Sequence, residues 1–154
     1  MILKHRDRRD RRGLGLKMHV KLATYFLPTL VGPGELDGET AVVIDLLRAS
    51  TTICHALAAG ATAVVPCLEV EEAKRIDAML PPGKAILGGE REGVRIPGFD
   101  LGNSPDEFRP DTVGGRTVVF TTTNGTRAMN ECRRAAQVFI GSLEWPVPTS
   151  VSGL

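Results

Sequence analysis

Short apolar runs alternate with amphipathic segments along most of this chain, and this alternation limits the possible folds more than any other feature. Residues 41–44 are apolar at every position, which is typical of a strand covered on both faces of a sheet. Residues 49–59 then carry apolar side chains at helical spacing and are followed by Gly60, a common helix stop. Strands that alternate with helices in this way predict a parallel sheet.

The alternation continues to about residue 140. Further strands are predicted at 19–24, 63–65, 85–87, 117–120 and 138–140. Further helices are predicted at 70–80 and 126–134, with another helix start at Ser104 and a long loop over 88–103. The sequence therefore predicts an α/β fold with a mainly parallel sheet and helices on both faces, in three α/β/α layers.

The two ends of the chain differ from its middle. Residues 1–17 contain seven Lys or Arg and two Asp, whereas residues 18–154 have a net charge of −4. No apolar segment or interleaved aromatic residue accompanies the basic run, so a disordered leader is favoured over a targeting peptide, and nucleic-acid binding is disfavoured. Residues 143–154 show no periodicity. We therefore expect a leader at 1–17, an α/β domain at 18–142 and an irregular tail at 143–154.

The cysteines and the hydropathy pattern indicate a cytoplasmic protein. Cys54, Cys67 and Cys132 are odd in number and widely spaced, which favours neither a disulfide framework nor a zinc site. No apolar run approaches the ~20 residues of a membrane helix. We therefore expect no membrane contact.

Polar residues collect directly after the predicted strands. The carboxyl ends of parallel strands meet at one edge of a sheet, where α/β proteins bind ligands. The segments that follow four of the predicted strands are 45–52, 88–93, 121–126 and 141–142. Acidic, arginine, hydroxyl and glycine residues are therefore predicted to share one edge.

These residue types suit an anion that is bound together with a metal ion. The guanidinium groups of Arg48 and Arg91 can form paired hydrogen bonds with phosphate, sulfonate or carboxylate oxygens. Carboxylates are ligands that Mg²⁺ prefers, and Asp45, Glu90 and Asp100 are the candidates. Hydroxyl and N–H groups at the predicted helix starts, where anions are favoured, belong to residues 50–52 and 123–126.

Each of these segments also has a purely structural interpretation. Ser50 and Thr126 can be helix caps, and residues 124–125 can form a tight turn. Arg48 can be the ion-pair partner of Asp45. Walker A and Rossmann glycine patterns are absent from the sequence, and no histidine is well placed for a Ser-His-Asp arrangement. The shared position at one predicted edge favours the functional interpretation.

Five collinear segments of the chain resemble the 2-phosphosulfolactate phosphatase family. They are VIDLLRASTTI at 43–53, GGER at 88–91, GFDLGNSP at 98–105, TTTNGT at 121–126 and GS at 141–142. The resemblance implies magnesium-dependent hydrolysis of a phosphate monoester of a small anionic hydroxy acid, namely 2-phosphosulfolactate to sulfolactate and phosphate. In organisms that make coenzyme M, the family's substrate is (R)-2-phospho-3-sulfolactate.

The resemblance also implies roles for individual residues. The catalytic candidates are Asp45, Arg48, Glu90 and Asn124. The magnesium candidates are Asp45, Glu90 and Asp100. The candidates for substrate binding are Arg48, Ser50, Thr51, Arg91, Asn103, Ser104, Thr122, Thr123, Gly125 and Thr126, and the turn at 122–126 is expected to surround the phosphoryl oxygens.

Members of this family are considerably longer than this chain and have a second α/β portion. The alternative function is therefore a truncated, catalytically silent anion-binding module of the same fold. A sheet that ends after Ile140 also leaves strand edges or apolar faces uncovered, so a homo-oligomer is expected.

Overall fold

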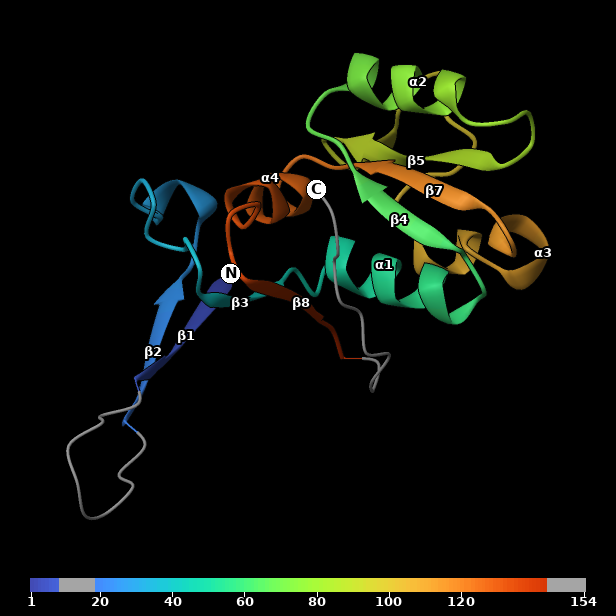
Figure 1. Ribbon diagram of the computed structural model, residues 1–154. Coiled ribbons are helices and arrows are strands. Elements are labelled where there is room, and N and C mark those ends of the chain that lie inside the picture. The colour runs from blue at the N-terminus through green and yellow to red at the C-terminus, as the bar shows by residue number, and fades with distance from the viewer. Residues whose placement is uncertain (9–18, 144–154) are drawn as a thin grey trace.

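The computed structural model describes residues 1–8 and 19–143, which form two four-stranded sheets with helices packed around them (Figure 1). The strands are β1 Ile2–Arg8, β2 His19–Tyr25, β3 Thr40–Ile44, β4 Ala63–Pro66, β5 Ala85–Arg91, β6 Val94–Arg95, β7 Thr117–Thr121 and β8 Gln137–Gly141. The helices are α1 Ala49–Ala58, α2 Val70–Met79, α3 Pro110–Val113 and α4 Gly125–Glu131, with 3₁₀ turns η1 Pro28–Leu30 and η2 Pro105–Glu107.

The α/β fold is confirmed, but its sheets are mixed. Sheet A has the strand order β2-β1-β3-β8, and sheet B has the order β4-β7-β5-β6. The pairs β3–β8, β4–β7 and β5–β7 are parallel, as expected for strands joined through helices. The pairs β1–β2, β1–β3 and β5–β6 are antiparallel. The predicted mainly parallel sheet is thus corrected to two mixed sheets, each of which contains a parallel part.

Sheet B is covered on both faces, and strand β7 shows why. Val119 packs in one apolar cluster with Ala73 of α2. Its neighbours Val118 and Phe120 pack in the other cluster with Ile53 of α1. Successive side chains of a strand point to opposite faces, and all three β7 residues are fully buried. Figure 1 shows α2 on one side of this sheet and α1 and α3 on the other.

Helix α1 joins the two sheets into one core. Ile53 lies in the same buried cluster as Val43 and Ile140 of sheet A and Val118 of sheet B. Burial of a side chain of this size contributes about 1.5–3 kcal/mol. The carboxyl ends of β3 and of the sheet B strands are therefore held close together by a helix that packs on both sheets.

The N-terminal segment departs from the expected disordered leader. Residues 2–8 form β1, which pairs with β2 on one side and with β3 on the other. Ile2 is fully buried in the core, and the Met1 backbone exchanges hydrogen bonds of 2.9 and 2.8 Å with Ile44. The basic run concealed this apolar anchor at the second position. Residues 9–17 and 144–154 lie outside the described residues, so the leader and tail remain predictions there.

The expected loop over 88–103 begins as regular structure. Strand β5 continues to Arg91 and turns into β6 through Glu92 and Gly93, whose φ angles are 54° and 80°. Two central residues with positive φ are typical of a type I′ hairpin. Gly89 permits this path, because a Cβ there would lie 2.1 Å from the carbonyl oxygen of Thr121. The neighbouring Glu90 is therefore held on a strand and not on a loop.

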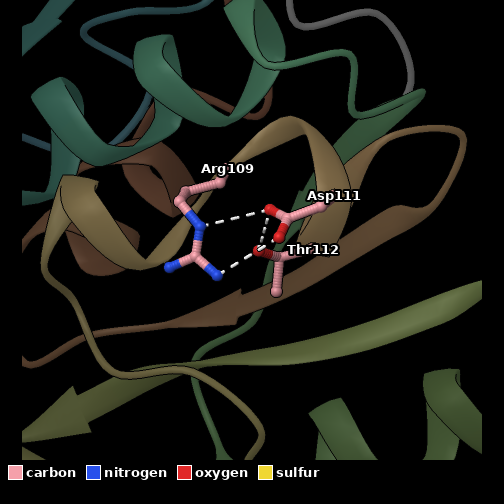
Figure 2. A network of polar contacts seen from close by, with 3 residues as sticks. All are labelled: Arg109, Asp111 and Thr112. Atoms are coloured by element: carbon pink, nitrogen blue, oxygen red, sulfur yellow. Dashed lines mark hydrogen bonds and ion pairs between the residues drawn. The ribbon is translucent and has the colours of Figure 1, made fainter.

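A local ion pair lies at the start of α3 (Figure 2). Arg109 Nε donates to Asp111 Oδ1 at 3.2 Å, and Arg109 Nη2 donates to Oδ2 at 3.4 Å. These bonds with Arg109 are the main cause that lowers the pKa of the Asp111 carboxyl. Exposed pairs of this kind contribute little to stability. The pair differs from Arg48 and Arg127, whose guanidinium groups have no acidic partner among the described residues.

The helices of the structure are short. Helices α1 and α2 each have ten residues, about half the length that a bilayer core requires. Within residues 1–8 and 19–143, no helix combines the length and the apolar character needed to cross a membrane.

The thiols of Cys67 and Cys132 provide a test of the core. Both are free and buried, and burial raises the pKa of Cys67 to about 12 and that of Cys132 to about 11. Because the thiolate is the nucleophile, both should react slowly with iodoacetamide in the folded protein and rapidly in denaturant. Unfolded thiols ionise near pH ~8.5, so the free energy of unfolding should fall as the pH rises from there. Rapid alkylation of both native thiols, measured by mass spectrometry, would contradict this packing.

Candidate functional site

A cavity of about 570 Å³ lies where the ends of β3, β5 and β7 converge, and we call it the main cavity. The predicted residues that line it are Asp45, Arg48, Glu90, Asn103, Thr122, Thr123, Asn124 and Gly125. All four predicted catalytic residues are therefore brought to one place. Their individual roles stay predictions.

The main cavity also has an apolar wall that the sequence did not predict. Phe26, Leu27, Leu46 and Leu47 line it, and all but Leu46 are more than half exposed, Phe26 at 73% and Leu47 at 90%. The signal was present in the sequence, because Phe26 and Leu27 come just after the first predicted strand, separated from it only by Tyr25. Large apolar side chains in this number beside a polar site indicate a surface that binds or packs against another group.

Asp45 directly follows β3, and the start of α1 fixes its backbone. The Asp45 N–H donates to Ser50 Oγ at 2.8 Å, and the Asp45 carbonyl accepts from the Ser50 N–H at 2.9 Å. Burial raises the pKa of the Asp45 carboxyl; the Met1 ammonium and the Ala49 amide oppose this effect, and the nearby Glu90 carboxylate adds to it. A half-buried carboxylate beside a second carboxylate favours a bound cation.

Arg48 is half-buried at the wall of the main cavity. Among the described residues its guanidinium has no hydrogen-bond or ion-pair partner, so the ion pair with Asp45 that the structural interpretation requires is not formed. The five N–H donors of Arg48 are therefore available to an anion in the cavity.

Glu90 is buried and tied to the turn between β7 and α4. Its Oε1 accepts from the Thr123 N–H at 2.9 Å, and its Oε2 accepts from the Gly93 N–H at 2.7 Å and from the Thr123 hydroxyl at 3.3 Å. Burial acts to raise the pKa of Glu90, but these hydrogen bonds and the Arg91 cation outweigh it, so the pKa is lowered. Glu90 therefore carries a fixed negative charge and positions the turn.

Thr122 and Thr126 bind each other within that turn. The Thr126 N–H donates to Thr122 Oγ1 at 3.2 Å, and the Thr122 N–H donates to Thr126 Oγ1 at 3.3 Å. The Thr123 N–H is bound to Glu90. These three N–H groups therefore already donate within the protein, and the contact of the 122–126 turn with phosphoryl oxygens stays a prediction. Asn124 is exposed, and its side chain has no partner among the described residues.

Five predicted substrate-binding residues do not line the main cavity, and three of these are held in local hydrogen bonds at helix starts. The Ser50 hydroxyl is buried against the β3–α1 backbone, where it accepts from Asp45 N–H. The Thr51 hydroxyl donates to the Leu46 carbonyl at 2.9 Å. Ser104 begins η2, and its N–H donates to Glu107 Oε1 at 3.4 Å. These contacts agree with the structural interpretation of helix starts.

Asp100 is separate from the other two predicted metal ligands. Its Oδ2 accepts from the Leu87 N–H at 2.9 Å, which ties the segment after β6 to β5. No group of three His, Cys, Asp or Glu residues that could hold a metal occurs within the ranges that the structure describes. The structure therefore does not bring Asp100 to the main cavity, where Asp45 and Glu90 lie, and the metal-binding roles stay predictions.

Asn103 supplies a further oxygen at the main cavity. The residue is only 7% exposed, and its Oδ1 is buried without a hydrogen-bond partner in the described part of the chain. The Thr52 hydroxyl donates to the Asn103 carbonyl at 3.0 Å and fixes its backbone. A buried amide oxygen without a partner is costly, and a cation or an ordered water would satisfy it.

Arg91 lies in a second cavity of about 300 Å³. Its Nη2 donates to the Leu68 carbonyl at 2.7 Å and to Thr121 Oγ1 at 2.9 Å, and its Nη1 donates to the Glu90 carbonyl at 2.9 Å. The structure therefore does not bring the two predicted arginines to one anion, since Arg48 lines the main cavity and Arg91 lines the second cavity.

Arg127 also lines the second cavity, and the sequence prediction missed it. The polar segment predicted after β7 ends at Thr126, one residue before Arg127. The available signal was a basic residue in the first turn of a helix that follows a strand of the sheet.

The chain matches the family model described as 2-phosphosulpholactate phosphatase over residues 25–144. A probable 2-phosphosulfolactate phosphatase of Symbiobacterium thermophilum is 54% identical over 109 residues, which cover 71% of this chain and 47% of the relative. Similar proteins of Clostridium acetobutylicum and Caldanaerobacter subterraneus subsp. tengcongensis are 50% and 43% identical, over 71% and 79% of this chain and 46% and 51% of theirs. The chain spans about half the length of these curated relatives.

Gly125 brings α4 against α1 beneath the main cavity. A Cβ at this position would lie 2.3 Å from the Ala49 Cβ and 3.0 Å from Asp45 Oδ2. We predict that Gly125→Ala lowers the free energy of unfolding by about 1–3 kcal/mol, because the two helices must separate. Denaturant unfolding measures the loss.

Ala49→Gly provides the matched partner variant, because it removes the methyl group that the new side chain would meet. The double variant should lose less stability than the sum of the two single variants. Additive losses would show that the 49–125 contact does not limit the approach of the helices.

Proposed function

Because the chain belongs to the 2-phosphosulpholactate phosphatase family, we propose that it acts in the magnesium-dependent hydrolysis of a phosphate monoester of a small anionic hydroxy acid. The proposed substrate is 2-phosphosulfolactate, and the products are sulfolactate and phosphate. In an organism that makes coenzyme M, this reaction would belong to that biosynthesis. The observation that carries the proposal is the convergence of Asp45, Arg48, Glu90 and Asn124 on the main cavity.

The donor set of the main cavity suits Mg²⁺. Asp45 and Glu90 line the same cavity, and the buried Asn103 amide oxygen has no partner in the described part of the chain. Mg²⁺ is commonly held by one or two carboxylates together with substrate phosphate oxygens. These three residues would hold the ion. When bound, it would neutralise charge on the phosphoryl oxygens.

The remaining groups of the main cavity would act on the ester itself. Arg48 would bind phosphoryl oxygens through its unpartnered guanidinium, as arginine commonly does. In hydrolysis a water oxygen bonds to phosphorus, the bond from phosphorus to the ester oxygen breaks, and that oxygen receives a proton as the hydroxyl of sulfolactate. Asn124 would donate from its amide to the departing ester oxygen and so stabilise the charge that develops there.

A second candidate function is anion binding without turnover. The specific observation that favours it is the apolar wall of the main cavity, because nothing in the described residues covers Phe26 or Leu47. A site that is open on one side would bind a charged ligand, but bulk water would weaken the electrostatic stabilisation of the transition state there. Ligand binding without phosphate release is the outcome that identifies this function.

We also propose a cytoplasmic location and a homo-oligomeric assembly, with no membrane or nucleic-acid partner. The three free, buried cysteines suit a reducing compartment. The exposed side chains of Phe26, Leu27, Leu30 and Leu47 are apolar surface that self-association would cover. A monodisperse monomer in light scattering at high concentration would contradict the oligomer.

The variant Asp45→Asn tests the metal site, since it keeps the side-chain shape and removes the charge that attracts the cation. We expect Mg²⁺ affinity to fall by about tenfold or more and Mg²⁺-dependent phosphate release to fall with it. The melting temperature should change little, because Asp45 forms no ion pair in the described structure. Calorimetric titration with Mg²⁺ and thermal unfolding measure the two effects.

Asp100→Asn is the matched control, because this carboxylate lies outside both cavities and binds the Leu87 N–H. It should retain Mg²⁺ affinity and lose some stability. Undiminished Mg²⁺ affinity in Asp45→Asn, or equal losses in both variants, would remove Asp45 from the metal site. Phosphate release is also measured with the S. thermophilum relative, of which this chain matches 47%.

A further inference from the structure

The second cavity is a neighbour of the main cavity and differs from it in charge. Its lining consists of Leu68, Glu69, Arg91, Thr122, Thr123, Thr126 and Arg127. Thr122 and Thr123 line both cavities, so the turn after β7 separates two adjoining compartments. The second one contains two guanidinium groups and one carboxylate, a net charge that matches a single negative charge on a ligand.

Arg91 brings a cationic group into this compartment without a paired carboxylate. The acceptors of its three hydrogen bonds are the carbonyl oxygens of Leu68 and Glu90 and the hydroxyl of Thr121. Two of its five N–H groups remain. The charge of Arg91 also acts on the adjacent Glu90 carboxylate, but a partly buried guanidinium whose hydrogen-bond acceptors are all neutral still favours a further anion at its free N–H groups.

Arg127 is exposed at the wall of the same cavity. Its side chain has no hydrogen-bond or ion-pair partner among the described residues. Two other surface arginines of this chain have acidic partners: Arg109 pairs with Asp111 (Figure 2), and Arg134 Nη2 lies 2.7 Å from Asp37 Oδ2. Arg127 therefore adds an exposed cation to the compartment that already holds the hydrogen-bonded guanidinium of Arg91.

We propose that the second cavity binds the sulfonate of the substrate and that Arg127 determines this specificity. This inference rests on the proposed function, with the phosphate ester beside Arg48 in the main cavity. In 2-phosphosulfolactate the sulfonate lies one carbon farther from the phosphate than the carboxylate does, so it is the group that reaches a neighbouring compartment. Its single negative charge matches two arginines opposed by Glu69, and its oxygens suit a guanidinium fork.

Two esters that differ only in the sulfonate test the inference, namely 2-phosphosulfolactate and 2-phospholactate. Arg127→Ala should raise the KM for the sulfonated ester by about tenfold with little change in kcat, since the lost contact is made in both ground and transition states. The KM for 2-phospholactate should not change. Arg127→Lys retains the charge but not the paired N–H donors, so its KM for the sulfonated ester should lie between those of the wild type and Arg127→Ala. Arg109→Ala is the control, and it should change the KM for neither ester.

A direct binding measurement separates this inference from the phosphatase proposal. Sulfolactate is titrated into the full chain by calorimetry, and Arg127→Ala should weaken its binding by about tenfold. Binding that depends on Arg127 in a chain that releases no phosphate would contradict the phosphatase proposal alone. The inference is overturned if the wild-type chain does not bind sulfolactate or if Arg127→Ala binds it as tightly as the wild type. It is also overturned if Arg127→Ala raises the KM for both esters equally. Thermal unfolding confirms that each variant is folded.

Discussion

The buried carboxylate of Glu90 holds together the two segments on which the candidate site depends. Its two oxygens accept three hydrogen bonds, from Gly93 in the β5–β6 hairpin and from Thr123 in the turn after β7. Charge-assisted bonds of this kind are stronger than neutral ones, and they lower the pKa of Glu90 in spite of its burial. The negative charge is therefore retained at neutral pH. Without the Glu90 carboxylate, the hairpin and the turn would lose the acceptor that joins them. Both cavities would be affected, because residues of that turn line each of them.

A second constraint acts against the first, because the protein brings a like charge close to Glu90. The Asp45 carboxyl is half-buried, and both burial and the Glu90 carboxylate raise its pKa. Such an arrangement costs folding free energy, which proteins commonly accept at functional sites. Gly125 allows the start of α4 to lie close to Asp45, since only a residue without a Cβ fits beside Ala49 and the Asp45 carboxylate. Asp45 thus lies at a point of both close packing and like-charge repulsion. A bound cation would reduce the repulsion between Asp45 and Glu90.

The sequence predicted those parts of the fold in which local pattern and burial agree. The strand β3 and the helix α1 were predicted within one residue, because a strand buried on both faces is apolar throughout and a packed helix has a clear stripe. The strand β1 was missed, because seven basic residues obscured the one buried anchor, Ile2. The glycines of Gly88-Gly89-Glu90 led to the prediction of a loop, but the segment belongs to β5. Gly89 is required in this strand because a Cβ there would collide with the Thr121 carbonyl. For the site, the edge was predicted but not its partition into two cavities, because strand order decides which strand ends are neighbours.

The partition of the site follows from the pleat of a single strand. Glu90 and Arg91 are consecutive in β5, so their side chains point to opposite faces. Glu90 accordingly lines the main cavity, and Arg91 lines the second cavity. The turn after β7 lies between them and contributes Thr122 and Thr123 to both. One strand thereby places a carboxylate where a cation would bind and a guanidinium where an anion would bind, one residue apart. A substrate with two separated anionic groups is the kind of ligand that matches such a division, because each group can meet a cation in its own compartment.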